Sequence, residues 1–108
     1  MERLRGTIGL AMRAGQLALG EEGAVKAIRA GGAALALLDA DASENTRKRL
    51  TDACAYRKVP LAILPGGLLE DAAGRGGRMS AVMAPGGLAK RANELLSQSM
   101  DSDFSYIV

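Results

Sequence analysis

The sequence contains no histidine and only one cysteine, Cys54, among its 108 residues. A structural zinc site needs about four cysteine or histidine ligands, so this composition argues against one, and it excludes every catalytic triad built on histidine. A lone cysteine gives no indication of disulfides, which fits a reducing cytoplasm. Cys54 falls in a helical pattern, and we expect its thiol to be buried in the core.

Aromatic residues and long apolar runs are equally scarce. The aromatic residues are Tyr56, Phe104 and Tyr106, so small and aliphatic side chains must fill the core. No apolar run approaches the roughly 18 residues of a membrane-spanning helix, and no signal peptide is visible. We therefore expect one compact cytoplasmic domain without membrane contact.

Neither sign of charge dominates the chain. The 14 lysines and arginines exceed the 12 acidic residues by a formal net charge of +2. This excess is smaller than that of a typical nucleic-acid-binding protein. Hydrophobic residues make up 48% of the sequence, which is enough for a packed interior.

Helical and strand patterns alternate along the chain. We predict helices over residues 2–14, 21–30, 44–58, 68–73 and 88–98, and strands over 17–19, 33–38, 61–64 and 80–84. This alternation is typical of the α/β class and predicts an α/β/α sandwich with a small mixed sheet. Residues 1–98 form the predicted domain. Residues 99–108 are a tail that we expect to be disordered, with docking on a partner or an added strand as the alternatives.

The stretch from Gly20 to Arg29, GEEGAVKAIR, is the first candidate binding site. Glu21 and Glu22 fit the first turn of a helix, where carboxylates interact favourably with the helix dipole. Lys26 and Arg29 lie three residues apart and share a face. A helix start carries unpaired N–H groups that can face an anion, so we hypothesise that this one faces RNA. The alternative is an ordinary solvated helix face.

The stretch Gly74–Arg78 is a glycine-rich loop that contains Arg75 and Arg78. It is not a dinucleotide-binding fingerprint, because it follows a helix and has the wrong glycine spacing. Glycines would allow its backbone to approach RNA closely while the arginines supply charge. A flexible surface loop is the alternative interpretation.

Two further clusters have a simpler explanation. The basic run Arg47-Lys48-Arg49 is more typical of a solvated helix face than of a binding site. Asp39 and Asp41 with Glu44 could suggest a magnesium site or an acid/base pair, but aspartate between a strand and a helix is more often a turn former. We therefore expect no metal and no cofactor.

The order of residues from Ile8 to Leu61 resembles the YlxQ-type bacterial proteins of the kink-turn-binding ribosomal protein superfamily, which includes the L-seven-Ae and L-thirty-e types. The most specific parts are LAMRAGQLALG, which ends at Gly20, and DASENTRKRL. The resemblance continues more weakly to about Leu96. It implies a three-layer α/β/α sandwich with a four-stranded mixed sheet, and binding of structured RNA, ribosomal or kink-turn-like, without catalysis.

The resemblance also implies which residues contact RNA. Kink-turn binders of this superfamily carry a Gly-x-Asn-Glu-x-x-Lys pattern at the start of the second helix. Gly20 and Lys26 match this pattern, whereas Glu22 stands at the Asn position and Gly23 at the Glu position. Glu22 can only accept hydrogen bonds and repels phosphate, and Gly23 offers no side chain. The second contact of the family corresponds to residues 76–80. The expected RNA-binding residues are Gly20, Glu22, Gly23, Lys26, Arg29, Arg75 and Arg78.

Three functions are open at this point. The first is a monomeric, non-catalytic RNA-binding module. The second is a protein-interaction module of the transcription or translation machinery that has lost kink-turn recognition. The third, an enzyme on a small α/β scaffold, is disfavoured because the chain has no histidine, one cysteine and no phosphate-binding motif. The resemblance further implies a YlxR-type domain as a candidate partner within the same natural chain.

Overall fold

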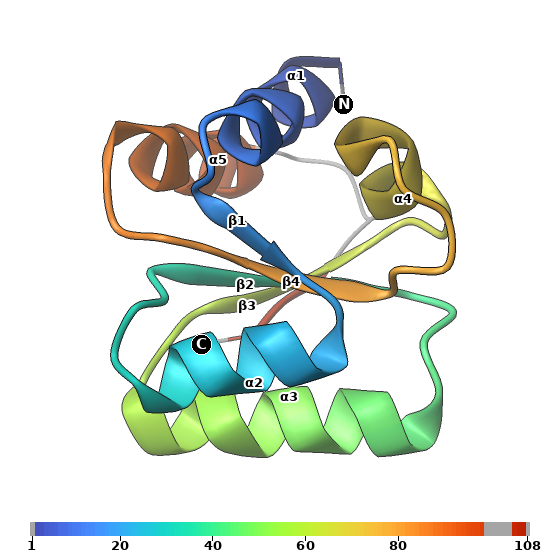
Figure 1. The fold of residues 1–108 in the computed structure, drawn as a ribbon, viewed down its shortest axis with the longest axis vertical. Coiled ribbons are helices and arrows are strands. Elements are labelled where there is room, and N and C mark those ends of the chain that lie inside the picture. The colour runs from blue at the N-terminus through green and yellow to red at the C-terminus, as the bar shows by residue number, and fades with distance from the viewer. Residues whose placement is uncertain (1, 99–104, 108) are drawn as a thin grey trace.

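The structure, a computed structural model, describes residues 2–98 and 105–107 and forms an α/β/α sandwich (Figure 1). Its helices are α1 (Glu2–Arg13), α2 (Glu21–Arg29), α3 (Glu44–Arg57), α4 (Leu68–Ala73) and α5 (Gly87–Gln98). Its strands are β1 (Leu17–Leu19), β2 (Leu35–Asp39), β3 (Leu61–Leu64), β4 (Ser80–Met83) and β5 (Ser105–Ile107). The predicted fold class is therefore confirmed, and the predicted bounds of these elements agree with the observed ones to within two residues.

The sheet is mixed and has the strand order β1-β4-β2-β3-β5. Strand β2 runs parallel to β3, with Ala36 opposite Leu61, while β4 runs antiparallel to both β1 and β2. These four strands are the expected four-stranded mixed sheet. The fifth strand lengthens it at the free edge of β3.

The tail contributes this fifth strand, which corrects the expectation of disorder for three of its residues. Ser105–Ile107 pairs antiparallel with β3, with Ile107 opposite Leu61. Without this pairing, β3 would present an open edge of unpaired N–H and C=O groups, and such an edge can accept an added strand. Residues 99–104 and Val108 lie outside the described residues, so the expectation of disorder for them stays a prediction.

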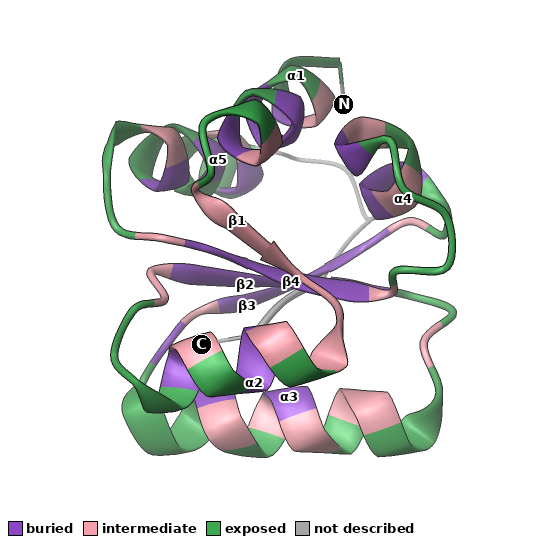
Figure 2. Ribbon diagram, viewed as in Figure 1, coloured by how far each residue is buried: buried purple, intermediate pink, exposed green. Residues whose placement is uncertain are grey.

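Helices cover both faces of the sheet. Helices α2 and α3 lie on one face, and α1, α4 and α5 lie on the other (Figure 1). Strand β2 is buried along its whole length, as expected from its continuous apolar run (Figure 2). On the α2–α3 face the fully buried side chains include Ile28, Leu38 and Leu50.

The direction of the strands fixes how α2 and α3 lie. Strands β1 and β2 both run antiparallel to β4, so they point the same way, and β3 runs parallel to β2. Each helix connects two strands of the same direction, so α2 and α3 run side by side in the same direction (Figure 1). Their first turns therefore meet at one end of the sheet, and their last turns meet at the other. At its start, α3 is capped as predicted, because the Ser43 hydroxyl accepts the Thr46 N–H at 3.2 Å.

Among the residues that the structure describes, no helix is both long and apolar enough to cross a membrane.

The thiol of Cys54 is buried in α3, as expected, and this burial raises its pKa to about 11. At pH 8 only roughly one such thiol in a thousand would be ionised, and the thiolate is the reactive form. We predict that a disulfide reagent such as Ellman's reagent modifies Cys54 at least about a hundredfold more slowly in native protein than in urea. Equal rates in the two conditions would show that Cys54 is not enclosed by the core.

Candidate nucleic-acid interface

The start of α2 presents backbone N–H groups that no side chain caps. Gly20 precedes the helix with a φ of 87°, a conformation that favours glycine, and it makes no side-chain cap. The first helical hydrogen bond at this end runs from the Ala24 N–H to the Gly20 carbonyl at 2.9 Å. The N–H groups of the three residues between them have no partner within the helix. This end of α2 can therefore face an anion.

The arginine-glycine loop, residues 74–79, lies beside the start of α2. It leads into β4, whose Ser80 carbonyl accepts the Gly20 N–H at 2.8 Å. The Arg78 side chain passes closely over Gly20, with its Cδ atom 3.9 Å from the point where a Cβ on Gly20 would lie. The structure thus brings Gly20 and Arg78 together from opposite parts of the sequence, as the RNA-binding hypothesis requires.

The backbone of this loop is held by Glu70 of α4. The Gly77 N–H donates to the Glu70 carboxylate, and the Arg75 N–H donates to the Glu70 carbonyl at 3.2 Å. Arg75 is exposed at the start of the loop, next to the end of α4. No atom of Arg75 lies among the described atoms within 4 Å of the Gly20 Cβ position, so Arg78 alone reaches Gly20.

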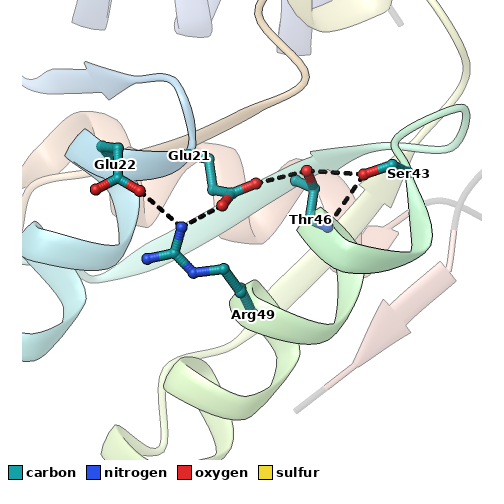
Figure 3. Close-up of polar contacts among 5 residues, drawn as sticks. All are labelled: Glu21, Glu22, Ser43, Thr46 and Arg49. Atoms are coloured by element: carbon teal, nitrogen blue, oxygen red, sulfur yellow. Dashed lines mark hydrogen bonds and ion pairs between the residues drawn. The ribbon is translucent and has the colours of Figure 1, made fainter.

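Both glutamates at the start of α2 are bound by one arginine of α3 (Figure 3). Arg49 donates from Nη1 to the Glu21 carboxylate and to Oε1 of Glu22, the latter at 2.7 Å. The Thr46 hydroxyl donates to the other oxygen of Glu21 at 2.6 Å. The Ser43 hydroxyl in turn donates to Oγ1 of Thr46 at 3.1 Å. These five residues join the first turns of α2 and α3.

This network changes the charge that α2 presents. The hydrogen bond from Thr46 and those from Arg49 hold the pKa of Glu21 below its ordinary value. The pKa of the Arg49 guanidinium is raised, first by the hydrogen bond with Glu22 and then by that with Glu21. Glu22 was expected to present a like charge to phosphate, and this stays a prediction. Its side chain is 87% exposed, but Arg49 pairs with it.

The residues of the basic run 47–49 have different roles. Lys48 pairs with Asp52 at 3.5 Å on the exposed side of α3, which fits a solvated face. Arg49 instead faces α2, and sequence reasoning missed this role. The available signal was the pair of glutamates at the start of one helix, but it is informative only once α2 and α3 are known to lie in parallel.

Lys26 and Arg29 are exposed on α2 and form no ion pair within the part of the chain that the structure describes. Together with Glu22 and Gly23, and with Arg49 from α3, they line an open groove of about 620 Å³. Gly23 has room for a side chain, because a Cβ there would have Ala18 as its nearest neighbour at 4.0 Å. Five of the seven expected RNA-binding residues therefore lie at the start of α2 or in its groove, and Arg78 lies beside Gly20, whereas Arg75 does not reach Gly20.

Asp39 acts as a turn former, as expected, while the same role for the Asp41 side chain stays a prediction. The buried carboxylate of Asp39 accepts the Asp41 N–H at 2.7 Å and the Gly67 N–H at 3.0 Å. Both oxygens of Asp39 are thus occupied by the backbone. No group of three or more potential metal ligands occurs in residues 2–98 and 105–107.

A family model with the description "Ribosomal protein L7Ae/L30e/S12e/Gadd45 family" matches residues 2–85. The chain therefore belongs to this family. Among curated proteins it is similar to RNA-binding protein YlxQ of Bacillus subtilis, with 51% identity over 53 residues. It is 49% identical over 53 residues to RNA-binding protein YlxQ of Enterococcus faecium. The match spans 49% of this chain and about half of each relative, 53% and 52%.

Solved structures extend the similarity over most of the chain. A protein of unknown function from Bacillus halodurans superimposes with a TM-score of 0.84 and 30% identity, covering 91% of this chain and 100% of that one. The Giardia lamblia 15.5kD RNA binding protein superimposes with a TM-score of 0.71 and 21% identity, covering 88% of this chain and 82% of that one. The second similarity is evidence for the fold alone.

The Glu21 contacts predict a pH-dependent contribution to stability. Because the folded-state pKa of Glu21 lies below the ordinary value of 4.5, its contacts stabilise the fold above that pH. This contribution is lost as the pH falls through the lowered pKa. We predict that Glu21→Gln lowers Tm at pH 7, and that the difference from the unmodified protein shrinks below about pH 4.5. Thermal melts monitored by circular dichroism at a series of pH values measure this.

The matched control is Glu94→Gln, because Glu94 is an exposed glutamate of α5 that forms no ion pair within the described ranges. Its substitution should change Tm little, both at pH 7 and below about pH 4.5. A Glu21→Gln effect that is absent at pH 7, or that grows as the pH falls, would contradict the assigned network.

Proposed function

We propose that this chain is a non-catalytic RNA-binding module that binds structured RNA through the start of α2 and the arginine-glycine loop. The observation that carries the proposal is the contact between Arg78 and Gly20, which sets a cation beside an uncapped helix start. Membership of the family and the name that both curated relatives carry support it. The lack of histidine and the burial of the one cysteine favour a binding role over catalysis.

In this proposal the phosphate backbone of the RNA lies across the start of α2. The free N–H groups after Gly20 and the guanidinium of Arg78 contact one phosphate region, because both present positive charge in one place. Lys26 and Arg29 follow along the groove and contact the next phosphates. Arg75, at the far end of the loop, contacts the RNA from the side of α4.

Kink-turn selectivity is weak in this proposal. Base-specific contacts need side chains that are free to bond base edges in the grooves. Gly23 supplies none, and the Glu22 carboxylate, which can only accept hydrogen bonds, already accepts one from Arg49 through Oε1. Phosphate contacts then supply most of the affinity and little sequence information.

The second candidate function is a protein-interaction module that has lost kink-turn recognition and acts with the transcription or translation machinery. The observation that favours it is the 87% exposure of Glu22 in the groove, where a carboxylate repels RNA phosphates. A YlxR-type domain in the same natural chain, the monomeric state and the cytoplasmic location stay predictions.

Lys26→Glu tests the α2 surface directly. The substitution removes a cation and places a like charge against phosphate, so we expect weaker binding of a structured RNA at every salt concentration. The slope of log K against log salt should become shallower by about 0.7–0.9 for each lost contact. Fluorescence titrations with a labelled hairpin RNA at several salt concentrations measure both quantities.

Lys90→Glu is the matched control, because Lys90 is an exposed lysine of α5 on the other side of the sheet. It makes the same change in net charge and should leave the salt slope nearly unchanged. If the two variants weaken binding equally, α2 is not the RNA-binding surface. If the unmodified protein binds no structured RNA, the protein-interaction function replaces this proposal.

A kink-turn RNA and a plain duplex of equal length test selectivity. We predict that the unmodified protein binds the two RNAs with similar affinity. Glu22→Asn together with Gly23→Glu should create a preference for the kink-turn, because the open space at Gly23 accepts a side chain that can hydrogen-bond a base. Each unmet buried hydrogen bond costs about 1–3 kcal/mol, so a preference of roughly tenfold is expected. Selective kink-turn binding by the unmodified protein would contradict this prediction. It would show that the backbone N–H groups and Arg78 suffice for kink-turn recognition.

A further inference from the structure

Tyr56, near the end of α3, is an exposed aromatic residue that the proposed function does not use. Its side chain is 84% exposed, whereas most large hydrophobic residues in the described part of the chain are buried or half-buried. Exposed aromatic rings that lie among cations are typical stacking platforms for unpaired bases.

The surroundings of Tyr56 are basic. A second groove, of about 290 Å³, is lined by Tyr56, Arg57, Asp52 and Ala53 of α3, with Arg29 and Arg49 as the residues that it shares with the first groove. The two grooves therefore meet at Arg29 and Arg49. They form a strip from the start of α2 to the last turn of α3, because the two helices run in the same direction.

Arg57 fixes the far end of this strip. Its guanidinium lies 6.0 Å from the centroid of the Tyr56 ring and donates to the Arg29 carbonyl in the last turn of α2. A cation at this place complements the negative end of the α2 dipole. Arg57 thus supports the ring, while the high exposure of Tyr56 leaves ring surface free for a ligand.

Charge in the strip favours a polyanion. Lys26, Arg29 and Arg57 form no ion pair within the described residues, whereas the two acids that line the grooves are both paired, Glu22 with Arg49 and Asp52 with Lys48. Unpaired cations along a groove with an aromatic ring at its end match the features of single-stranded nucleic-acid sites.

We propose that this strip binds a single-stranded RNA segment that flanks the structured RNA, with one unpaired base stacked on Tyr56. The segment leaves the structured RNA at the phosphates that contact Lys26 and Arg29, and its own phosphates contact Arg57 on the way to the ring. This inference rests on the proposed function, which it extends from the start of α2 to the end of α3. The end of α3 would contact RNA that lies beyond the start of α2, because α3 extends about 10 Å from Arg49 to Tyr56 at 1.5 Å per residue.

The test compares a blunt RNA hairpin with the same hairpin carrying a single-stranded extension at its 5′ or its 3′ end. The unmodified protein should bind one of the extended hairpins more tightly than the blunt one. Tyr56→Ala should lose this gain, by roughly five- to 150-fold for one stacked base, and bind the blunt hairpin as before. Tyr56→Phe keeps an aromatic ring and should retain most of the gain.

A second measurement reports on the ring itself. The chain has no tryptophan, and its two tyrosines are Tyr56 and Tyr106. In a Tyr106→Phe variant, Tyr56 is the sole tyrosine, and stacking of a base should quench its fluorescence when the extended hairpin is added. The blunt hairpin should leave the fluorescence nearly unchanged.

Three results would overturn the inference. If the unmodified protein binds the blunt hairpin and gains nothing from either extension, the strip does not bind single-stranded RNA, while the proposed function stands. If the extension adds affinity without quenching Tyr56, the ring is not a stacking platform for a base. A protein partner is then the remaining candidate ligand for the exposed ring. If neither RNA binds, the proposed function itself fails, and this inference fails with it.

Discussion

The antiparallel pairing of β1 with β4 is the constraint on which the candidate interface depends. It sets the Gly20 N–H on the Ser80 carbonyl at 2.8 Å, so the loop before β4 must lie beside the first turn of α2. Residues separated by nearly sixty positions in the chain thereby form one surface. Gly20 permits the tight turn into α2 through its positive φ, and the Arg78 side chain lies beside it, with Cδ 3.9 Å from the point where a Cβ on Gly20 would lie. Local sequence and sheet topology act together here, and neither alone would place the cation at the helix start.

Arg49 gives the interface its electrostatic character. A start of α2 with two free carboxylates would repel RNA, and the mild net charge of the chain would not compensate for this. By pairing with both Glu21 and Glu22, Arg49 reduces that repulsion and joins α2 to α3. The same contacts engage Oε1 of Glu22, and a carboxylate offers a base only acceptor atoms. In the proposed function, this pairing favours stability and general RNA affinity over base-specific recognition.

Much of the fold could be predicted from the sequence, because the signals for it are local. Strand Leu61–Leu64 and helix Leu68–Ala73 were predicted with their observed bounds, since Pro60, Pro65 and Gly74 mark their ends. The strand at Ser105–Ile107 could not be predicted with the same certainty, because it depends on the free edge of β3 rather than on its own pattern. The role of Arg49 was missed for a related reason. Its partners lie on another helix, and only the parallel arrangement of α2 and α3 brings them together.

The proposed RNA-binding surface consists of the start of α2 and residues 74–79. The most direct measurement is a titration of ¹⁵N-labelled protein with a structured RNA, monitored by amide chemical shifts. We expect the largest changes at the amides of residues 20–23, 26 and 76–79, and only small changes at those of α1 and α5. Changes concentrated on α1 and α5, or a full absence of changes at an RNA concentration that saturates binding, would contradict it.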